Sequence, residues 1–180
     1  MQILRLPGKA VAVARRHKDC VILCKLIFFA VNKCRTHSSQ YNDKFIKIMG
    51  KKEYAQANKE WLVEKAKEEG VMELPKGIYY KVLNQGNNDG NHPSVRSIIT
   101  AHYTGKTING KKFDSSRGGT PLACRLCELI EGWIIAMQKM CIGDKWEVYI
   151  PAEMGYGKFS QPGIPGNSTL IFEIELLGIA

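Results

Sequence analysis

From residue 78 onward, the chain consists mainly of short segments with the pattern of β-strands, and one short segment has the pattern of a helix. The strand-like segments are rich in β-branched and aromatic residues or alternate between apolar and polar residues: 78–83, 95–104, 145–150 and 169–177. Asn109-Gly110 lies between two extended segments, and this dipeptide is the strongest short-range signal of a hairpin. The helical segment, 128–140, has apolar residues three and four positions apart. Because crossover helices are missing, the pattern disfavours a parallel sheet and predicts an antiparallel α+β domain.

A long loop, 151–167, separates the last two strand segments. It contains six Gly or Pro residues after Pro151. Most connections in compact domains are shorter, and a loop of this length is usually functional. We therefore expect it to contribute to a binding or active site.

A second helix is predicted ahead of the strands, at 51–69. This segment lacks Gly and Pro, is rich in Ala, Glu and Lys, and is followed by Gly70. Its apolar residues form only a narrow stripe: Tyr54, Ala55, Ala57, Trp61, Leu62 and Ala66. A narrow stripe suits packing either on the chain's own domain or on a second copy, so a homodimer through this helix stays open.

The net charge of +9 is concentrated at the start of the chain. Residues 1–48 hold 10 of the 26 basic and 2 of the 17 acidic residues, which leaves 49–180 nearly neutral. We predict that 1–48 is a basic extension, poorly structured or non-native, with Met49 as a sensible start. A helix and linker would follow at 49–74, and the folded domain at 75–180. No nucleic-acid partner is expected of the nearly neutral part, and nucleic-acid binding through the basic extension stays as an alternative.

Residues 1–48 also carry the sequence signals for where the protein is located in the cell. A basic region followed by an apolar stretch at 21–31 is similar to a secretory signal, but Lys25 interrupts the stretch and no small-x-small cleavage site follows. We expect a cytoplasmic protein, with export or membrane anchoring through residues 1–31 as the alternative.

Three of the six cysteines lie in the extension and three in 49–180, and an odd number in each part is a poor disulfide framework. Cys124 and Cys127 have CxxC spacing without a second ligand pair, so neither metal nor cofactor is expected.

The chain lacks the sequence signs of covalent catalysis and of phosphate binding. It has no phosphate-binding glycine loop before a helix, no nucleophile elbow and no paired catalytic carboxylates. What remains is a set of aromatic and aliphatic residues at strand ends, loop edges and one helix face. Such a set predicts an apolar pocket with few polar groups. For any one of these residues taken alone, an ordinary core position is the simpler interpretation.

Taken together, several short motifs point to one family. In chain order they are Tyr103-Thr104-Gly105, Phe113-Asp114-Ser115-Ser116, Leu129-Ile130-Glu131-Gly132-Trp133, Pro151-Ala152-Glu153-Met154-Gly155-Tyr156-Gly157, Ile164-Pro165 and the segment 169–177. Over about residues 77–179 the chain resembles the FKBP-type peptidyl-prolyl cis-trans isomerases. The preceding helix and its junction with the domain look like the bacterial branch that includes the macrophage infectivity potentiators. The resemblance implies a strongly curved antiparallel sheet of five to six strands, wrapped on one short central helix and preceded by the N-terminal helix.

The resemblance also implies a site. Trp133 would form the pocket floor, and the backbone N–H of Ile130 would be a donor to a bound carbonyl. The resemblance assigns catalytic roles to Asp114, Tyr156, Trp133 and Phe113. It assigns substrate binding to Tyr103, Leu122, Leu129, Ile130, Ile164 and Phe172. Asp114 would either contact the twisting carbonyl or organise the rim by bonding Tyr103, and the second role is favoured.

The function implied is acceleration of X-Pro bond rotation in polypeptides, which assists protein folding. The alternative is a chaperone module that binds proline-containing peptides with little turnover. Proline-containing polypeptides are the expected partners, and macrolide inhibitors are further candidate ligands. Leu122 and Cys124 stand where many members carry aromatic residues, and Gln161 lies near a position often held by His. These departures leave substrate preference and macrolide affinity open.

Overall fold

The computed structural model describes residues 50–87 and 90–180. The predicted basic extension at 1–48, the start at Met49 and the alternative of export or anchoring through 1–31 lie outside the described residues. Within the described ranges, no helix combines the length and the apolar character that a membrane span requires.

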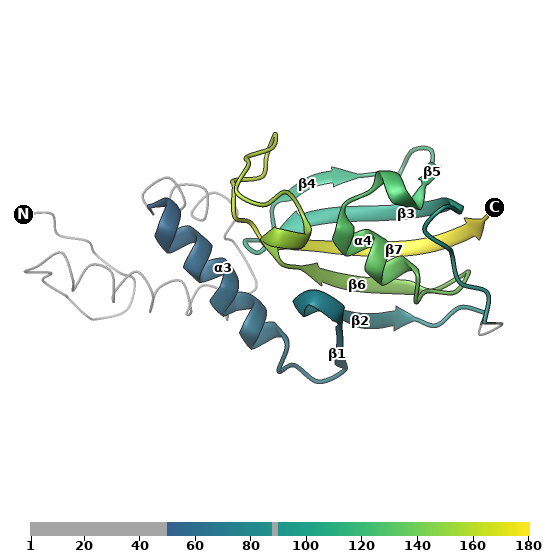
Figure 1. The fold of residues 1–180 in the computed structure, drawn as a ribbon, viewed down its shortest axis with the longest axis horizontal. Coiled ribbons are helices and arrows are strands. Elements are labelled where there is room, and N and C mark those ends of the chain that lie inside the picture. Colours follow the sequence, from purple (N-terminus) through teal and green to yellow (C-terminus); the bar gives the residue numbers. More distant parts are fainter. Residues whose placement is uncertain (1–49, 88–89) are drawn as a thin grey trace, which may run out of the picture. The chain divides into compact units, whose positions relative to one another are not determined.

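The described chain forms one antiparallel sheet, which confirms the predicted fold class (Figure 1). Its strands are β1 (Val71–Leu74), β2 (Ile78–Asn84), β3 (Ile98–Thr107), β4 (Lys112–Ser115), β5 (Leu122–Arg125), β6 (Lys145–Ile150) and β7 (Leu170–Ile179). They are ordered β1-β2-β6-β7-β3-β4, and β5 pairs with β3. The described residues therefore form seven strands rather than five or six. The two strands that the sequence does not predict, β1 and β5, have four residues each, too few to show a clear alternation.

The predicted hairpin is confirmed between β3 and β4. The backbone N–H of Thr107 donates to the carbonyl of Lys111 at 3.0 Å, and the N–H of Gly110 donates to the carbonyl of Thr107 at 2.8 Å. Gly110 has a φ of 80°, in the left-handed region that glycine adopts without a steric penalty.

The central helix is shorter than the predicted 128–140. Residues Leu126–Glu128 form a 3-10 turn, Ile130 is extended, and α4 runs over Glu131–Met137. This helix lies across one face of the sheet (Figure 1). The close approach depends on Gly132, because a Cβ there would lie 2.5 Å from Cγ2 of Ile150.

The core lies between α4 and the sheet. Along β7, alternate side chains are buried, as the sequence pattern predicts. Fully buried core residues include Ile99, Ala136, Met137, Val148, Ile150, Leu170, Ile174 and Leu176. The core therefore joins α4 to β3, β6 and β7, and three of these elements, α4, β3 and β7, also carry residues of the candidate site.

The N-terminal helix, α3 (Lys51–Lys65), packs on the chain's own domain. It ends at Lys65 rather than at the predicted Glu69. Tyr54, Asn58 and Leu62 are buried, and the Trp61 ring meets the Tyr149 ring edge-on at a centroid distance of 5.9 Å. Of the two alternatives for its narrow stripe, the structure shows packing on the same chain.

Candidate active site

Four aromatic rings from four different elements meet at one end of α4. Trp133 on α4 lies 5.3 Å from Tyr103 on β3 and 5.2 Å from Phe172 on β7, measured between ring centroids. Phe113 on β4 lies 5.5 Å from Phe172. All three contacts are edge-to-face, an arrangement that the quadrupoles of aromatic rings favour. The rings therefore support one another and form a rigid apolar surface.

The other predicted apolar residues adjoin these rings. Trp133, Phe172 and Ile164 belong to the buried core, whereas the remaining site residues pack against it and stay half-buried: Tyr103, Phe113, Leu122, Leu129, Ile130 and Tyr156. Leu122 comes from the unpredicted strand β5, and Leu129 and Ile130 precede α4. Half-buried side chains around a buried Trp133 form an apolar surface that a ligand can reach, which is the composition expected of a binding site.

The exposed carboxylate of Asp114 is held at the edge of this pocket. The Tyr103 hydroxyl donates to Oδ2 of Asp114 at 2.6 Å, and the backbone N–H of Ser115 donates to Oδ1 at 2.8 Å. Both carboxylate oxygens thus accept hydrogen bonds from β3 and β4. This geometry suits the role of organising the rim.

The two tyrosines of the site stay protonated. Burial raises the pKa of Tyr103 to about 12, and the hydrogen bond to Asp114 adds to the effect. Burial also raises the pKa of Tyr156, with a further contribution from the negative charge of Asp114. Because a phenol ordinarily titrates near pH 10, both hydroxyls are donors at neutral pH.

A backbone donor lies beside them. The carbonyl of Ile130 accepts the first bonds of α4, from the N–H of Trp133 at 2.9 Å and of Ile134 at 3.2 Å. Within the part of the chain that the structure describes, the N–H of Ile130 itself donates to no protein group. Since Ile130 is only half-buried, this N–H is available to a carbonyl bound in the pocket.

Sequence reasoning assigned no role to Gly105, which the structure places under two pocket rings. A Cβ at this position would lie 2.5 Å from Cε2 and Cζ of Phe113 and 2.8 Å from Cε1 of Phe172. Real Cβ atoms do not approach other atoms so closely. A glycine inside a strand pattern is a recognised sign of close approach, so the signal was present in the sequence.

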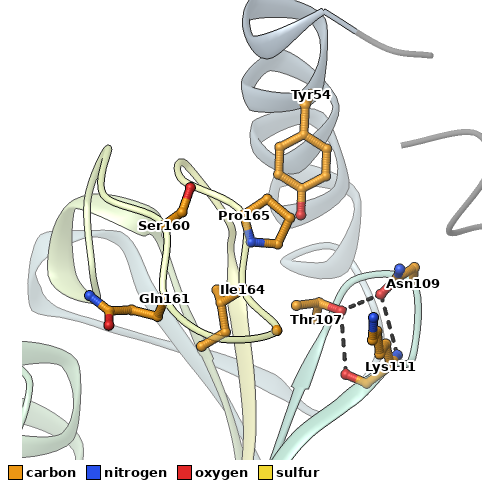
Figure 2. A pocket seen from close by; sticks show the side chains of 9 residues that line it. Tyr54, Thr107, Asn109, Lys111, Ser160, Gln161, Ile164 and Pro165 are labelled. Carbon is orange, nitrogen blue, oxygen red and sulfur yellow. Dashed lines mark hydrogen bonds between the residues drawn. The ribbon is translucent and has the colours of Figure 1, made fainter. Parts of the chain in front are cut away.

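A cavity of about 290 Å³ lies between α3, the β3–β4 hairpin and the long loop, and its lining residues are shown in Figure 2. It is bounded by Tyr54 of α3, by the β3–β4 hairpin and by residues 160–165 of the loop. Among its described lining residues, Ile164 is the one that also belongs to the predicted site. Ile164 therefore borders this cavity and also belongs to the buried cluster that contains Trp133 and Phe172.

The CxxC cysteines lie beside the pocket as free thiols. Cys124 is half-buried on β5 and Cys127 is exposed. Burial raises the pKa of Cys124, with smaller contributions from Glu128 and Cys127, so its thiol stays protonated near neutral pH. Within residues 50–87 and 90–180, no group of three or more His, Cys, Asp or Glu side chains could hold a metal ion.

Residues 90–177 match the family model of FKBP-type peptidyl-prolyl cis-trans isomerases, and residues 30–82 match the model of the domain amino terminal to these isomerases. The chain is 44% identical over 121 residues to the FKBP-type 22 kDa peptidyl-prolyl cis-trans isomerase of Escherichia coli, covering 66% of this chain and 58% of that protein. It is 37% identical over 127 residues to the peptidyl-prolyl cis-trans isomerase Mip of Coxiella burnetii, covering 69% and 54%. The chain thus spans about half the length of the curated relatives it matches.

Two solved structures have the same fold. A peptidyl-prolyl cis-trans isomerase from Pseudomonas syringae pv. tomato superposes with a TM-score of 0.68 at 30% identity, covering 73% of this chain and 97% of that chain. The structure of FkpA from Escherichia coli gives a TM-score of 0.65 at 32% identity, covering 92% and 83%. The chain therefore belongs to the family of FKBP-type peptidyl-prolyl cis-trans isomerases, among bacterial members that include the Mip proteins.

Proposed function

We propose that this chain is a peptidyl-prolyl cis-trans isomerase that acts on proline-containing polypeptides and assists their folding. One observation carries the proposal: beside the aromatic cluster around Trp133, the backbone N–H of Ile130 has no hydrogen-bond partner among the residues that the structure describes. A pocket of this kind can bind a proline ring and hold the adjoining peptide without reacting with it covalently.

Such a pocket suits bond rotation for a physical reason. The barrier to rotation about a peptide bond is about 18–20 kcal/mol because the planar amide is stabilised by resonance. In the twisted transition state the resonance and its dipolar form are lost, so an apolar environment favours the twisted amide over the planar one. A rate acceleration of about 10⁵ requires roughly 7 kcal/mol of such preference.

The residues of the site contribute to this reaction in different ways. Trp133 presents a buried aromatic surface on which the proline ring stacks. The Ile130 N–H and the protonated Tyr156 hydroxyl bind the carbonyls on either side of the rotating bond, which places the bond against the apolar walls. Asp114 keeps Tyr103 in position and does not itself need to contact the substrate.

A protease-coupled isomerisation assay with the full chain and proline-containing peptides tests the proposal. We expect the cis-to-trans rate to rise in proportion to the concentration of the chain. If the chain binds these peptides but the rate equals that in buffer, the isomerase proposal is wrong and the peptide-binding chaperone becomes the better account.

The same pocket is our proposed site for macrolide inhibitors, because they would occupy the apolar walls that hold the proline ring. Competition between a macrolide and the peptide substrate tests this.

A homodimer through α3 would have to use the exposed face of that helix, since the residues of its buried stripe already pack on the same chain. Light scattering of the full chain measures the mass of the species present.

Substitutions at the rim separate the two roles for Asp114. If Asp114 acts by holding Tyr103, Tyr103→Phe and Asp114→Ala remove the same bond and should each lower kcat/KM by roughly three- to tenfold. The double variant should then be no worse than the more affected single variant. A much larger loss for Asp114→Ala, additive with Tyr103→Phe, would instead mean that Asp114 contacts the substrate.

The pH profile follows from the raised tyrosine pKa values. We expect kcat/KM to be constant within about twofold between about pH 7 and pH 9, because both phenols remain protonated there. A decline with a midpoint below pH 9 would contradict this.

The raised pKa of Tyr103 also predicts how stability depends on pH. The stability that Tyr103 contributes is fully present below pH 10, the pKa of a tyrosine in the unfolded chain, and is lost as the pH rises to about 12, its pKa in the folded chain. Tyr103→Phe should therefore weaken the alkaline loss of stability.

A further inference from the structure

The helix α3 is hydrogen-bonded to the point where the long loop joins β7. Thr169, the residue before β7, donates its backbone N–H to Oδ1 of Asn58 at 2.7 Å, and its hydroxyl donates to the backbone carbonyl of Asn58 at 3.3 Å. Both residues are 1% exposed. Since the side-chain N–H of Asn58 donates to the carbonyl of Tyr54, one turn earlier in α3, the amide is held in one orientation. A buried amide with these partners is a specific connection between the helix and the loop.

A second connection runs through Ser168. Its hydroxyl donates to the carbonyl of Pro165 at 2.6 Å and lies 2.8 Å from the hydroxyl of Tyr54. Because Ser168 has a single hydroxyl proton and Pro165 accepts it, the Tyr54 hydroxyl must be the donor to Ser168. The path from Tyr54 therefore ends at Pro165, the neighbour of Ile164, which belongs to the same buried cluster as Trp133.

The loop is closed by hydrogen bonds between its own residues. The N–H of Asn167 donates to the carbonyl of Gly157 at 2.7 Å, and the N–H of Gly166 donates to Oγ of Ser160 at 3.1 Å. Its base at 168–169 is the part that α3 holds.

Packing alone does not fix the loop on the side facing α3. The cavity of about 290 Å³ borders Tyr54, Ile164 and Pro165 there (Figure 2). A protein interior without such a void would resist displacement of Ile164 by close packing. Ile164 is held within the loop by two backbone hydrogen bonds with Gln161, both at 2.9 Å, so its position follows that of the loop, which α3 holds at 168–169.

We propose that Asn58 and Tyr54 are positioning residues for the isomerase site, which act from outside it by fixing the 157–167 loop and with it Ile164. This inference rests on the proposed function. Ile164 is one of the apolar residues of the site. Loosening it lowers the fraction of chains in which the site is formed before the peptide binds, so the apparent affinity for the peptide falls by that fraction. Once the peptide is bound Ile164 is in place again, which appears as a higher KM at nearly constant kcat.

The experiment compares Asn58→Ala and Tyr54→Phe with two control variants of α3 in the full chain. Leu62→Ala removes a buried apolar side chain of the same helix and no bond to the loop, and Val63→Ala alters a side chain that is 56% exposed. All are assayed at a temperature where unfolding curves show them to be folded. Asn58→Ala should raise KM by about fivefold with kcat within twofold, and Tyr54→Phe should raise KM by about twofold. Both controls should keep the wild-type KM.

A second readout does not depend on isomerase activity. Phe159 in the loop is 78% exposed, so chymotrypsin cleavage after it, identified by mass spectrometry, reports the mobility of the loop. Cleavage should be about fivefold faster in Asn58→Ala than in Leu62→Ala or in wild type. Tyr54→Phe and Ser168→Ala should not have additive effects on the cleavage rate, because both remove the hydrogen bond between Tyr54 and Ser168.

The outcomes separate the two proposals. An inactive wild-type chain would refute the proposed function, whereas the cleavage rates would still test the fixing of the loop. If KM and cleavage are unchanged in Asn58→Ala, or change equally in Leu62→Ala, the hydrogen bonds of α3 do not position the loop and the inference is wrong.

Discussion

Trp133→Ala should remove measurable isomerase activity and lower the free energy of unfolding by about 3–5 kcal/mol. The side chain is 3% exposed and contacts the rings of Tyr103 and Phe172, so its loss leaves a cavity where the proline ring should stack. The pocket would then hold water next to the rotating bond, and the apolar environment that favours the twisted amide would be lost.

Trp133→Phe is the matched control for this prediction. Among the described residues the indole N–H of Trp133 has no hydrogen-bond partner, so phenylalanine keeps an aromatic floor without breaking a bond within the protein. It should retain roughly a tenth of the wild-type kcat/KM, a change of about 1.4 kcal/mol. Protease-coupled kinetics and urea unfolding measure the two effects. An Ala variant with near wild-type kcat/KM would mean that catalysis takes place elsewhere.

Gly105→Ala should damage the pocket although it adds only a methyl group. The new Cβ would overlap the rings of Phe113 and Phe172, which must shift because the strand backbone of β3 is held on both sides by β4 and β7. Overpacking of this kind costs about 1–3 kcal/mol of stability. If about 2 kcal/mol of transition-state stabilisation is lost with the displaced rings, kcat/KM falls by roughly 30-fold.

The control for Gly105 is Gly119→Ala in the loop between β4 and β5. A Cβ there would have one neighbour, the carbonyl oxygen of Ser116 at 3.8 Å, and the backbone is outside the left-handed region. This variant should have wild-type kinetics. Equal activity of the Gly105→Ala variant and wild type would show that the two rings can move without cost and do not shape the pocket.

The sequence predicts the site residues well because they occur in short local motifs. Phe113 and Asp114 are neighbours on β4, and Ile130 and Trp133 are separated by one turn at the start of α4. The alternation of β7 likewise identifies Phe172 as an inward-facing residue. In each case the relevant geometry is set by the residue's own strand or helix, whose period can be read along the chain.

Other features could not be predicted from such patterns. The strands β1 and β5 exist because they pair with β2 and β3, and four residues show no period of their own. The predicted central helix is shorter at both ends: Leu129 and Ile130 are extended, and Lys139 and Met140 form i to i−3 backbone hydrogen bonds after the helix ends at Met137. Hydrogen bonding to neighbouring segments decided these boundaries, which is a property of the folded chain.

The sequence by itself determined the fold class, the residue types of the pocket and the family, because periodicity, turn residues and motifs act over a few neighbouring positions. Only the tertiary structure decided that the Ile130 N–H has no partner among the described residues, that Gly105 lies under two rings, and that α3 is bonded to the loop beside Ile164. Asn58 and Thr169 are 111 positions apart, and Tyr54 and Ser168 are 114 positions apart. No local pattern reports a contact over such a separation, since its free energy arises only when the whole sheet has formed and brought the two segments together.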